Sequence, residues 1–263
     1  MTGRVWDDAP EAVRQQVTTC VGAIARTLGG NLVGVYLYGS LAVGCFNPRR
    51  SDVDLLIVTH AGMAPETKRD LAELLLRLSG SPSPIEVSFL TTGSLAPWRH
   101  PASYDFHFSE DWRAHYERAL RHGEWTRWVG TLGEAPHMAV NVTLARKRGM
   151  VLFGSPANAA LPSIPEQDFV DAILSDGERA RERVDREPGY AILNHCRTLA
   201  YLRERRTLSK HEGAVWALAA LPSRYHHLIA QALEQYGDDG EPGQFDMMHV
   251  QRFLDDHDLG EPA

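Results

Sequence analysis

Strand-forming residues gather in the first half of this chain, and helical patterns occupy the second half. β-Branched and aromatic residues run through three segments, at 32–38, 52–58 and 85–90. Apolar residues spaced three and four apart predict helices at 10–28 and 65–78. Because helices alternate with strands in this way, we predict an α/β layer.

After about residue 135 the strand signals disappear, and the remaining pattern is helical. Helices are predicted at 140–149, 166–186, 191–205, 211–221, 223–236 and around 247–254, with a polar loop at 237–243. Pro156, Pro162 and Pro165 punctuate the junction between the two halves. A chain of 263 residues is long enough for two domains. We therefore predict an α/β domain over 1–156 and an all-helical domain over 157–263.

The charge balance and the lack of long apolar segments limit the possible partners. The chain carries 27 Lys and Arg residues against 34 Asp and Glu residues, a net charge of -7 with a pI near 5.9. A broad nucleic-acid surface needs an excess of basic residues, so we expect no nucleic-acid partner. We find no run of 18 apolar residues and no signal-peptide pattern near the N-terminus. We therefore expect a cytoplasmic protein with no membrane partner.

Cysteine and histidine spacing gives no sign of a metal site. The three cysteines are scattered and form no CxxC pair, which indicates reduced thiols rather than disulfides or zinc. HExxH and HxxxH spacing is absent. We therefore interpret two histidine pairs, His226 with His227 and His107 with His115, as surface or loop residues.

Two aspartates and a Gly-Ser turn form the most informative pattern. Asp52 and Asp54 are two residues apart on a predicted strand, so they point to the same face. Like charges so placed repel each other, and a divalent cation relieves the repulsion; Mg²⁺ takes one or two carboxylates plus phosphate oxygens. Gly39 and Ser40 end the preceding strand, where exposed backbone N–H groups are able to cradle phosphate. The alternative for such a pair is a solvated face of a half-exposed sheet.

Glu86 is a third candidate carboxylate. It shares one face of its predicted strand with Ser88, while the other face is apolar. If this strand neighbours the one with Asp52 and Asp54, three carboxylates converge. Two would hold a metal on a triphosphate, and the third would remove the proton of an attacking hydroxyl. The pattern favours phosphoryl or nucleotidyl transfer, although Glu86 alone is also compatible with a surface glutamate.

These residues resemble a known family. Gly39-Ser40 followed by Ser51-Asp52-Val53-Asp54-Leu55-Leu56 is similar to the signature of the polymerase-β-related nucleotidyltransferases. More closely, nearly the whole chain resembles the aminoglycoside adenylyltransferases that modify streptomycin and spectinomycin. Further motifs that carry this resemblance are Ile85-Glu86-Val87, Phe108–Arg113, Val151–Gly154 and Leu193–Arg197.

The resemblance implies a fold and a nucleotide site. The fold would be an N-terminal domain with a mixed sheet and helices, followed by an all-helical bundle, with ATP and drug in the cleft between them. It implies that the triphosphate and Mg²⁺ are held by Ser40, Ser51, Asp52 and Asp54, and that Glu86 is the general base. It further implies that Arg197 and Lys210 reach the triphosphate, and that Tyr236 lies at the nucleotide.

The resemblance also implies a drug site, in a region where the chain departs from the family. Trp112 matches a family tryptophan that packs on streptomycin, although a lone Trp is also typical of core packing. The family's acidic loop is shorter here, and Asp185 and Glu187 are its expected substitutes. Because neighbouring arginines make this stretch less acidic, a solvated, salt-bridged helix end is the alternative.

The sequence therefore predicts an adenylyltransferase that uses ATP and Mg²⁺ and modifies a small cationic antibiotic, streptomycin and/or spectinomycin, to give resistance. We expect a monomer. Two alternatives stay open. One is the same chemistry on another acceptor, such as a lincosamide or a protein. The other is a nucleotide-binding regulator without catalysis.

Overall fold

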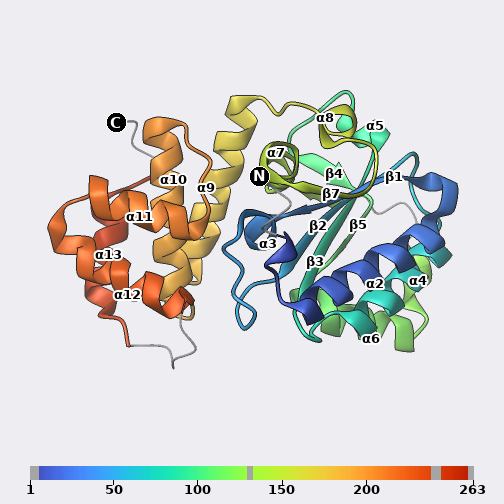
Figure 1. Ribbon diagram of the computed structural model, residues 1–263, viewed down its shortest axis with the longest axis horizontal. Coiled ribbons are helices and arrows are strands. Elements are labelled where there is room, and N and C mark those ends of the chain that lie inside the picture. The colour runs from blue at the N-terminus through green and yellow to red at the C-terminus, as the bar shows by residue number, and fades with distance from the viewer. Residues whose placement is uncertain (1–5, 129–132, 238–243, 260–263) are drawn as a thin grey trace. The chain divides into compact units, whose positions relative to one another are not determined.

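The computed structural model describes residues 6–128, 133–237 and 244–259, so most of the predicted loop at 237–243 lies outside the described residues. The chain forms two compact units, Met1–Pro165 and Glu166–Ala263 (Figure 1). The break lies at the last of the three prolines that punctuate the junction, after Pro165, rather than at Pro156.

A five-stranded mixed sheet forms the centre of the first unit. Its order is β5-β3-β2-β1-β7. Strands β2 and β3 are parallel, and the other neighbouring pairs are antiparallel. The strands are β1 (Leu32–Tyr38), β2 (Val53–Thr59), β3 (Ile85–Thr91), β5 (Phe106–Phe108) and β7 (Met150–Gly154). The expected fold class, a mixed sheet followed by a helical domain, is confirmed.

The prediction that strands cease after about residue 135 is wrong. Strand β7, at residues 150–154, forms an edge of the main sheet. A second sheet just before this point pairs β6 (Gly133–Ala135) with β4 (Ala102–Tyr104). Strand β7 depends on pairing with β1, more than a hundred residues earlier in the sequence, and its Val151 and Phe153 are 41% and 45% exposed. Local periodicity carries no signal for such distant pairing.

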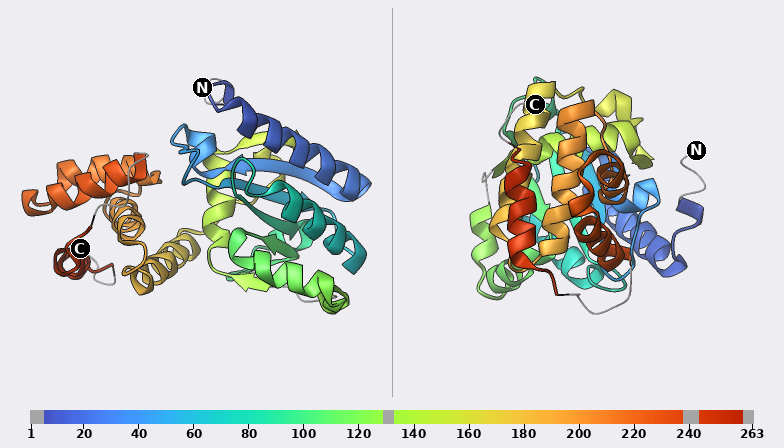
Figure 2. Two further views of the ribbon diagram at one scale, coloured as in Figure 1. Left: turned by 90° about the horizontal axis from the view of Figure 1, so that it is seen from below. Right: turned by 90° about the vertical axis from the view of Figure 1, so that its left-hand side faces the viewer.

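Helices cover both faces of the main sheet, as Figures 1 and 2 show. Alternate strand residues, such as Val35, Leu55 and Val87, pack with the core formed by one helical layer. Their neighbours along the strands, such as Tyr36 and Leu56, pack into a second core on the other face. The first layer contains α2 (Glu11–Leu28), α4 (Pro65–Leu78) and α6 (Arg113–Arg121); the second contains α5 (Thr92–Leu95), α7 (Met138–Arg148) and α8 (Ala157–Ala160).

Short elements connect these layers. They are η1 (Gly29–Asn31), α3 (Gly39–Val43), η2 (Glu110–Trp112) and η3 (Glu124–Trp128). Two of them carry predicted site residues. Helix α3 follows β1 directly and contains Ser40, and η2 leads into α6 and contains Trp112.

The second unit is a helical bundle built around α10 (Pro188–Glu204). Apolar side chains of α10, such as Ile192, Cys196 and Leu199, are buried in the core of the bundle. The surrounding elements are α9 (Glu166–Glu182), α11 (Lys210–Ala220), η4 (Ser223–Tyr225), α12 (His226–Gly237) and α13 (Met247–Asp256). Among the described helices, none has the length and apolar character needed to cross a bilayer.

Candidate active site

Three adjacent strands bring Tyr38, Asp54 and Glu86 into one row. Tyr38, the last residue of β1, pairs with Asp54 in β2, and Asp54 pairs with Glu86 in β3. Neighbouring strands are about 4.8 Å apart, and paired residues point to the same face. Asp54 and Glu86 are both half-buried. The strands that carry the two carboxylates are therefore neighbours, as the convergence of the carboxylates requires.

The turn after β1 lies against the Asp54 carboxylate. Gly39 has φ +70°, a conformation that side-chain-bearing L-residues rarely adopt. A Cβ atom at Gly39 would lie 1.8 Å from Oδ2 of Asp54 and 2.7 Å from its carboxyl carbon. Glycine is thus required here by both conformation and space. Ser40 follows it, half-buried, in the first turn of α3.

Ser51 and Asp52 lie in the segment that leads into β2. The predicted strand begins one residue later than expected, at Val53, so Asp52 directly precedes it and is exposed. The Ser51 side chain is buried, and its Oγ accepts a hydrogen bond from the Asn47 backbone N–H at 3.0 Å. The Ser51 N–H donates to the Asn47 carbonyl at 2.8 Å. Ser51 therefore closes the loop that places Asp52 directly before the first residue of β2.

The donor set around Asp52 and Asp54 fits magnesium better than zinc. Within the described residues, no group of three His, Cys, Asp or Glu side chains is arranged to hold a metal ion. Structural zinc usually needs four protein ligands. Mg²⁺ instead uses one or two carboxylates and completes its shell with water and phosphate oxygens.

A pair formed by buried Ser88 and half-buried His107 continues the Glu86 face of the sheet. Ser88 is fully buried, and its Oγ lies 3.0 Å from Nδ1 of His107 in β5. Burial, with a smaller contribution from nearby His137, lowers the pKa of His107 to about 4. The interpretation of His107 as a surface or loop residue is therefore wrong. His107 lies within β5 rather than in a loop, and it is half-buried because the second helical layer lies on this face of the sheet.

In the second unit, Arg197 lies on α10 where this helix meets α11. Its Nε donates to Oδ1 of Asn194 at 2.8 Å, and Asn194 is almost fully buried. A Cβ atom at Gly213 of α11 would lie 2.8 Å from the backbone of Arg197. The absence of a side chain at Gly213 therefore lets α11 approach α10 at Arg197.

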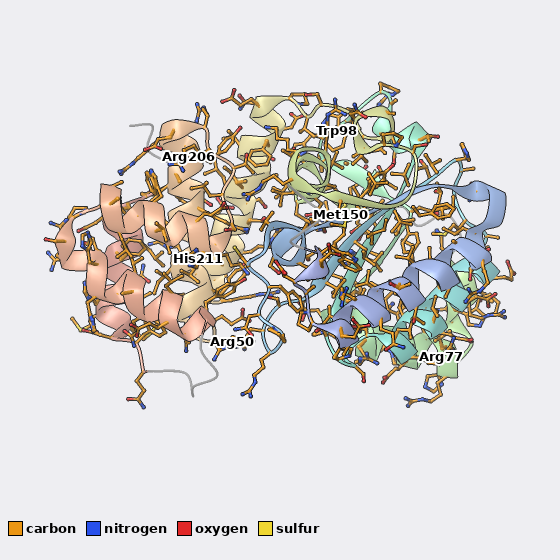
Figure 3. The ribbon with its side chains drawn as sticks, in the orientation of Figure 1. Arg50, Arg77, Trp98, Met150, Arg206 and His211 are labelled. Atoms are coloured by element: carbon orange, nitrogen blue, oxygen red, sulfur yellow. The ribbon has the colours of Figure 1, made fainter. Side chains whose placement is uncertain are left out.

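Lys210 begins α11 and lies beside two tyrosine rings. Its Nζ is 4.4 Å from the ring centre of Tyr190 and 5.5 Å from that of Tyr236. Both distances are within the range of cation–π attraction. Ser209 caps the helix through a reciprocal capping box with Glu212. His211, which follows Lys210 in the sequence and is labelled in Figure 3, is exposed. The structure thus brings together two predicted nucleotide residues, Lys210 and Tyr236.

Comparison with known proteins assigns both units. Residues 23–93 match the model of a nucleotidyltransferase domain, and residues 159–256 match that of an aminoglycoside adenylyltransferase C-terminal domain. The chain belongs to the aminoglycoside adenylyltransferases.

Individual adenylyltransferases match over most of their length. A spectinomycin 9-adenylyltransferase of Staphylococcus aureus is 29% identical over 85% of each chain. An aminoglycoside (3'') (9) adenylyltransferase of Klebsiella pneumoniae is 28% identical, also over 85% of each chain. The crystal structure of a spectinomycin adenyltransferase from Enterococcus faecialis, determined with ATP and spectinomycin, has the same fold. It has a TM-score of 0.81 at 20% identity and covers 94% of this chain and 99% of that chain.

The predicted drug residues of this adenylyltransferase lie in both units. Trp112 ends η2 in the first unit and is 44% exposed, which excludes burial in a core. Its indole meets the His115 ring edge-on at a centroid distance of 5.5 Å. Asp185 and Glu187 are exposed in the turn between α9 and α10. One neighbouring arginine, Arg181, pairs with Asp255 of α13, in keeping with the alternative of a salt-bridged helix end.

Sequence reasoning missed two residues of this adenylyltransferase that contact predicted site residues. Tyr190 packs on Lys210, and Gly213 contacts Arg197, in each case between different helices. No periodic pattern connects these positions, because helix-to-helix contacts depend on how the bundle packs. Gly213 does lie three residues after Lys210 and therefore on the same face of α11, which is the one signal that could have indicated it.

Proposed function

We propose that this protein transfers AMP from ATP to a hydroxyl group of spectinomycin, streptomycin or both, releasing pyrophosphate and giving resistance to the drug. The observation that carries the proposal is the row formed by Tyr38, Asp54 and Glu86 on three neighbouring strands, with the Gly39 turn in contact with the Asp54 carboxylate. The family assignment supports adenylyl transfer as the reaction. We place the reaction in the cytoplasm and assign it to the monomer.

Glu86 is the proposed general base. Its carboxylate takes the proton of the drug hydroxyl as that oxygen attacks the α-phosphorus of ATP. The new bond joins the drug oxygen to the α-phosphorus, and the bond from that phosphorus to the bridging oxygen of pyrophosphate breaks. Asp52 and Asp54 would hold Mg²⁺, which when bound neutralises charge on the triphosphate.

Basic residues of the second unit are proposed to bind the nucleotide. Arg197 and Lys210 would contact the triphosphate, because cations stabilise its charge and the charge that develops on pyrophosphate. Tyr236 would lie at the nucleotide, next to Lys210. Ser40 and Ser51 are proposed to bind the triphosphate from the first unit.

Drug recognition is proposed to use an aromatic and an acidic element. The exposed indole of Trp112 offers a flat apolar surface, and Asp185 and Glu187 offer exposed negative charge to a cationic drug. Trp112, Asp185 and Glu187, together with Glu86, are the residues that we propose to contact the drug.

An acceptor panel tests the proposal. The full-length protein is incubated with ATP, Mg²⁺ and one acceptor at a time: spectinomycin, streptomycin, a lincosamide or a protein mixture. We expect pyrophosphate release and a mass gain of one AMP on spectinomycin or streptomycin. A mass gain only on the lincosamide or a protein would show that the proposed drug is not the substrate. ATP binding with no transfer to any acceptor would favour a nucleotide-binding regulator.

A further inference from the structure

A group of hydrogen bonds ties the η2 turn to the loop before β3. Arg113 donates from Nε and Nη2 to the two carboxylate oxygens of Glu110, at 2.6 and 2.9 Å. The hydroxyl of Ser79 donates to the same carboxylate. Arg113 also donates to the carbonyls of Leu76 and Ser79, each at 3.0 Å. We call Ser79, Glu110 and Arg113 the Glu110 bracket.

The bracket reaches the strand that carries Glu86. The backbone N–H of Ile85 donates to Oγ of Ser79 at 2.8 Å, and Ile85 is buried. Ile85 pairs with Val53 in β2, and the Val53 N–H donates to the carbonyl of Pro84 at 2.8 Å. The next pair along these two strands is Asp54 with Glu86. The bracket is therefore hydrogen-bonded to the residue directly before Glu86.

The bracket also encloses Trp112 in the sequence. Glu110 begins η2, Trp112 ends it, and Arg113 begins α6. The indole of Trp112 is 44% exposed, so burial alone does not fix its position. The backbone of the η2 turn is anchored on either side of Trp112 by the ion pair between Glu110 and Arg113.

We infer that Glu110 is a positioning residue, which holds the Trp112 turn in a fixed place relative to the strand that carries Glu86. The inference rests on the proposed function, in which Trp112 and Glu86 face the same drug. It adds that the Glu110 carboxylate, which accepts from both Ser79 and Arg113, fixes this geometry together with the bonds from Arg113 to the Leu76 and Ser79 carbonyls. Glu110 itself is not proposed to touch the substrate.

Glu110→Gln removes the charge and one of the two acceptor oxygens while keeping the shape of the side chain. The matched control is Glu117→Gln, because Glu117 is the second carboxylate near Arg113, at 3.8 Å, and has no contact with Ser79. Arg113→Lys is a second test, because it keeps the charge and loses the forked geometry. Each variant is assayed well below its unfolding temperature.

In Glu110→Gln we expect the KM for the drug to rise by about tenfold, since small misplacements of a positioning group have large effects. The KM for ATP should stay within about twofold of wild type. Hydrogen exchange of the peptides around Ile85 and Trp112 should accelerate together. Arg113→Lys should change in the same direction, and Glu117→Gln should match wild type in all three measurements.

Two results separate this inference from the proposed function. If wild type transfers AMP to the drug and Glu110→Gln has the same drug KM as Glu117→Gln, the positioning role is overturned. If wild type modifies neither drug, the proposed function fails. Coupled exchange at Ile85 and Trp112 in Glu110→Gln would then still support the link between turn and strand, and unchanged exchange would overturn it.

Discussion

The carboxylate of Asp54 lies directly over the α-carbon of Gly39. A side-chain carbon on Gly39 would lie 1.8 Å from Oδ2 of Asp54, far inside van der Waals contact. Asp54 also pairs with Glu86 on the neighbouring strand. The Gly39 turn, the Asp54 carboxylate and the Glu86 strand position are therefore in direct succession. A change in the turn therefore displaces the group proposed to hold the metal.

Gly39→Ala should abolish most of the activity. The substitution strains a φ of +70° by about 1–2 kcal/mol and pushes the Asp54 carboxylate aside. We expect kcat/KM to fall by about 10²-fold or more, the size of effect seen when reacting groups are displaced by about 1 Å. Gly123→Ala is the matched control, because Gly123 has φ +69° with no atom within 4 Å of the added carbon.

Both alanine variants should lose stability in thermal unfolding because of the strained φ, and Gly39→Ala should lose more because of the clash with Asp54. Only Gly39→Ala should lose activity. If Gly123→Ala lost as much activity as Gly39→Ala, backbone strain rather than the Asp54 contact would explain the effect.

Gly213→Ala should destabilise the helical unit, although glycine-to-alanine changes inside helices usually stabilise by about 0.5–1 kcal/mol. The added carbon would lie 2.8 Å from the Arg197 backbone, so α11 has to move away from α10. Gly22→Ala in α2 is the control, since its nearest neighbour is a side-chain atom at 3.5 Å. Thermal unfolding should show opposite signs for the two variants, and a stabilising Gly213→Ala would contradict the close approach.

Tyr190 should contribute to ATP binding through its ring rather than its hydroxyl. Its ring centre is 4.4 Å from Nζ of Lys210, and cation–π attraction at such sites is about 0.5–1 kcal/mol. Tyr190→Ala should raise the KM for ATP by about two- to fivefold, whereas Tyr190→Phe should stay near wild type. An equal rise in the KM for ATP in both variants would show that the hydroxyl, and not the ring, contributes to ATP binding.

His107 should make the first unit less stable in acid. Burial lowers its pKa from 6.5 to about 4, so the folded state favours the neutral ring. This contribution is fully present above pH 6.5 and is lost as the pH falls toward 4, because the unfolded chain binds the proton first. His107→Asn keeps a polar atom for Ser88 and should flatten the fall in unfolding temperature between pH 6.5 and 4. An unchanged slope would show that His107 does not titrate on unfolding.

The central strands were predictable from the sequence, and the edges of the sheet were not. Local apolar patterns predict strand β1, helix α4 and most of β2 and β3. In each of these segments the apolar residues recur at the spacing of the buried positions. Strand β7 exposes Val151 and Phe153, so it lacks a one-sided pattern and forms only by pairing with β1.

The candidate site divides in the same way. Asp54 was found because it lies two residues from Asp52 in a strand-like segment, and Glu86 because it lies on the polar face of its own predicted strand. The family resemblance assigned both of them roles. His107 was misinterpreted because nothing in its own segment indicates that a second layer of helices covers that face. Tyr190 was missed because its contact with Lys210 joins two helices of the bundle.

The proposed role of Glu86 as the base for adenylyl transfer to a drug hydroxyl is tested by substituting its carboxylate. The rate of AMP transfer to spectinomycin and streptomycin is compared between wild type and Glu86→Gln, at saturating ATP and Mg²⁺. Exposed Glu66→Gln in α4 serves as the control. We predict that Glu86→Gln lowers kcat by about 10²–10⁴-fold, with the KM for ATP nearly unchanged and Glu66→Gln at wild-type rate. A folded Glu86→Gln protein that transfers AMP as fast as wild type would contradict the account.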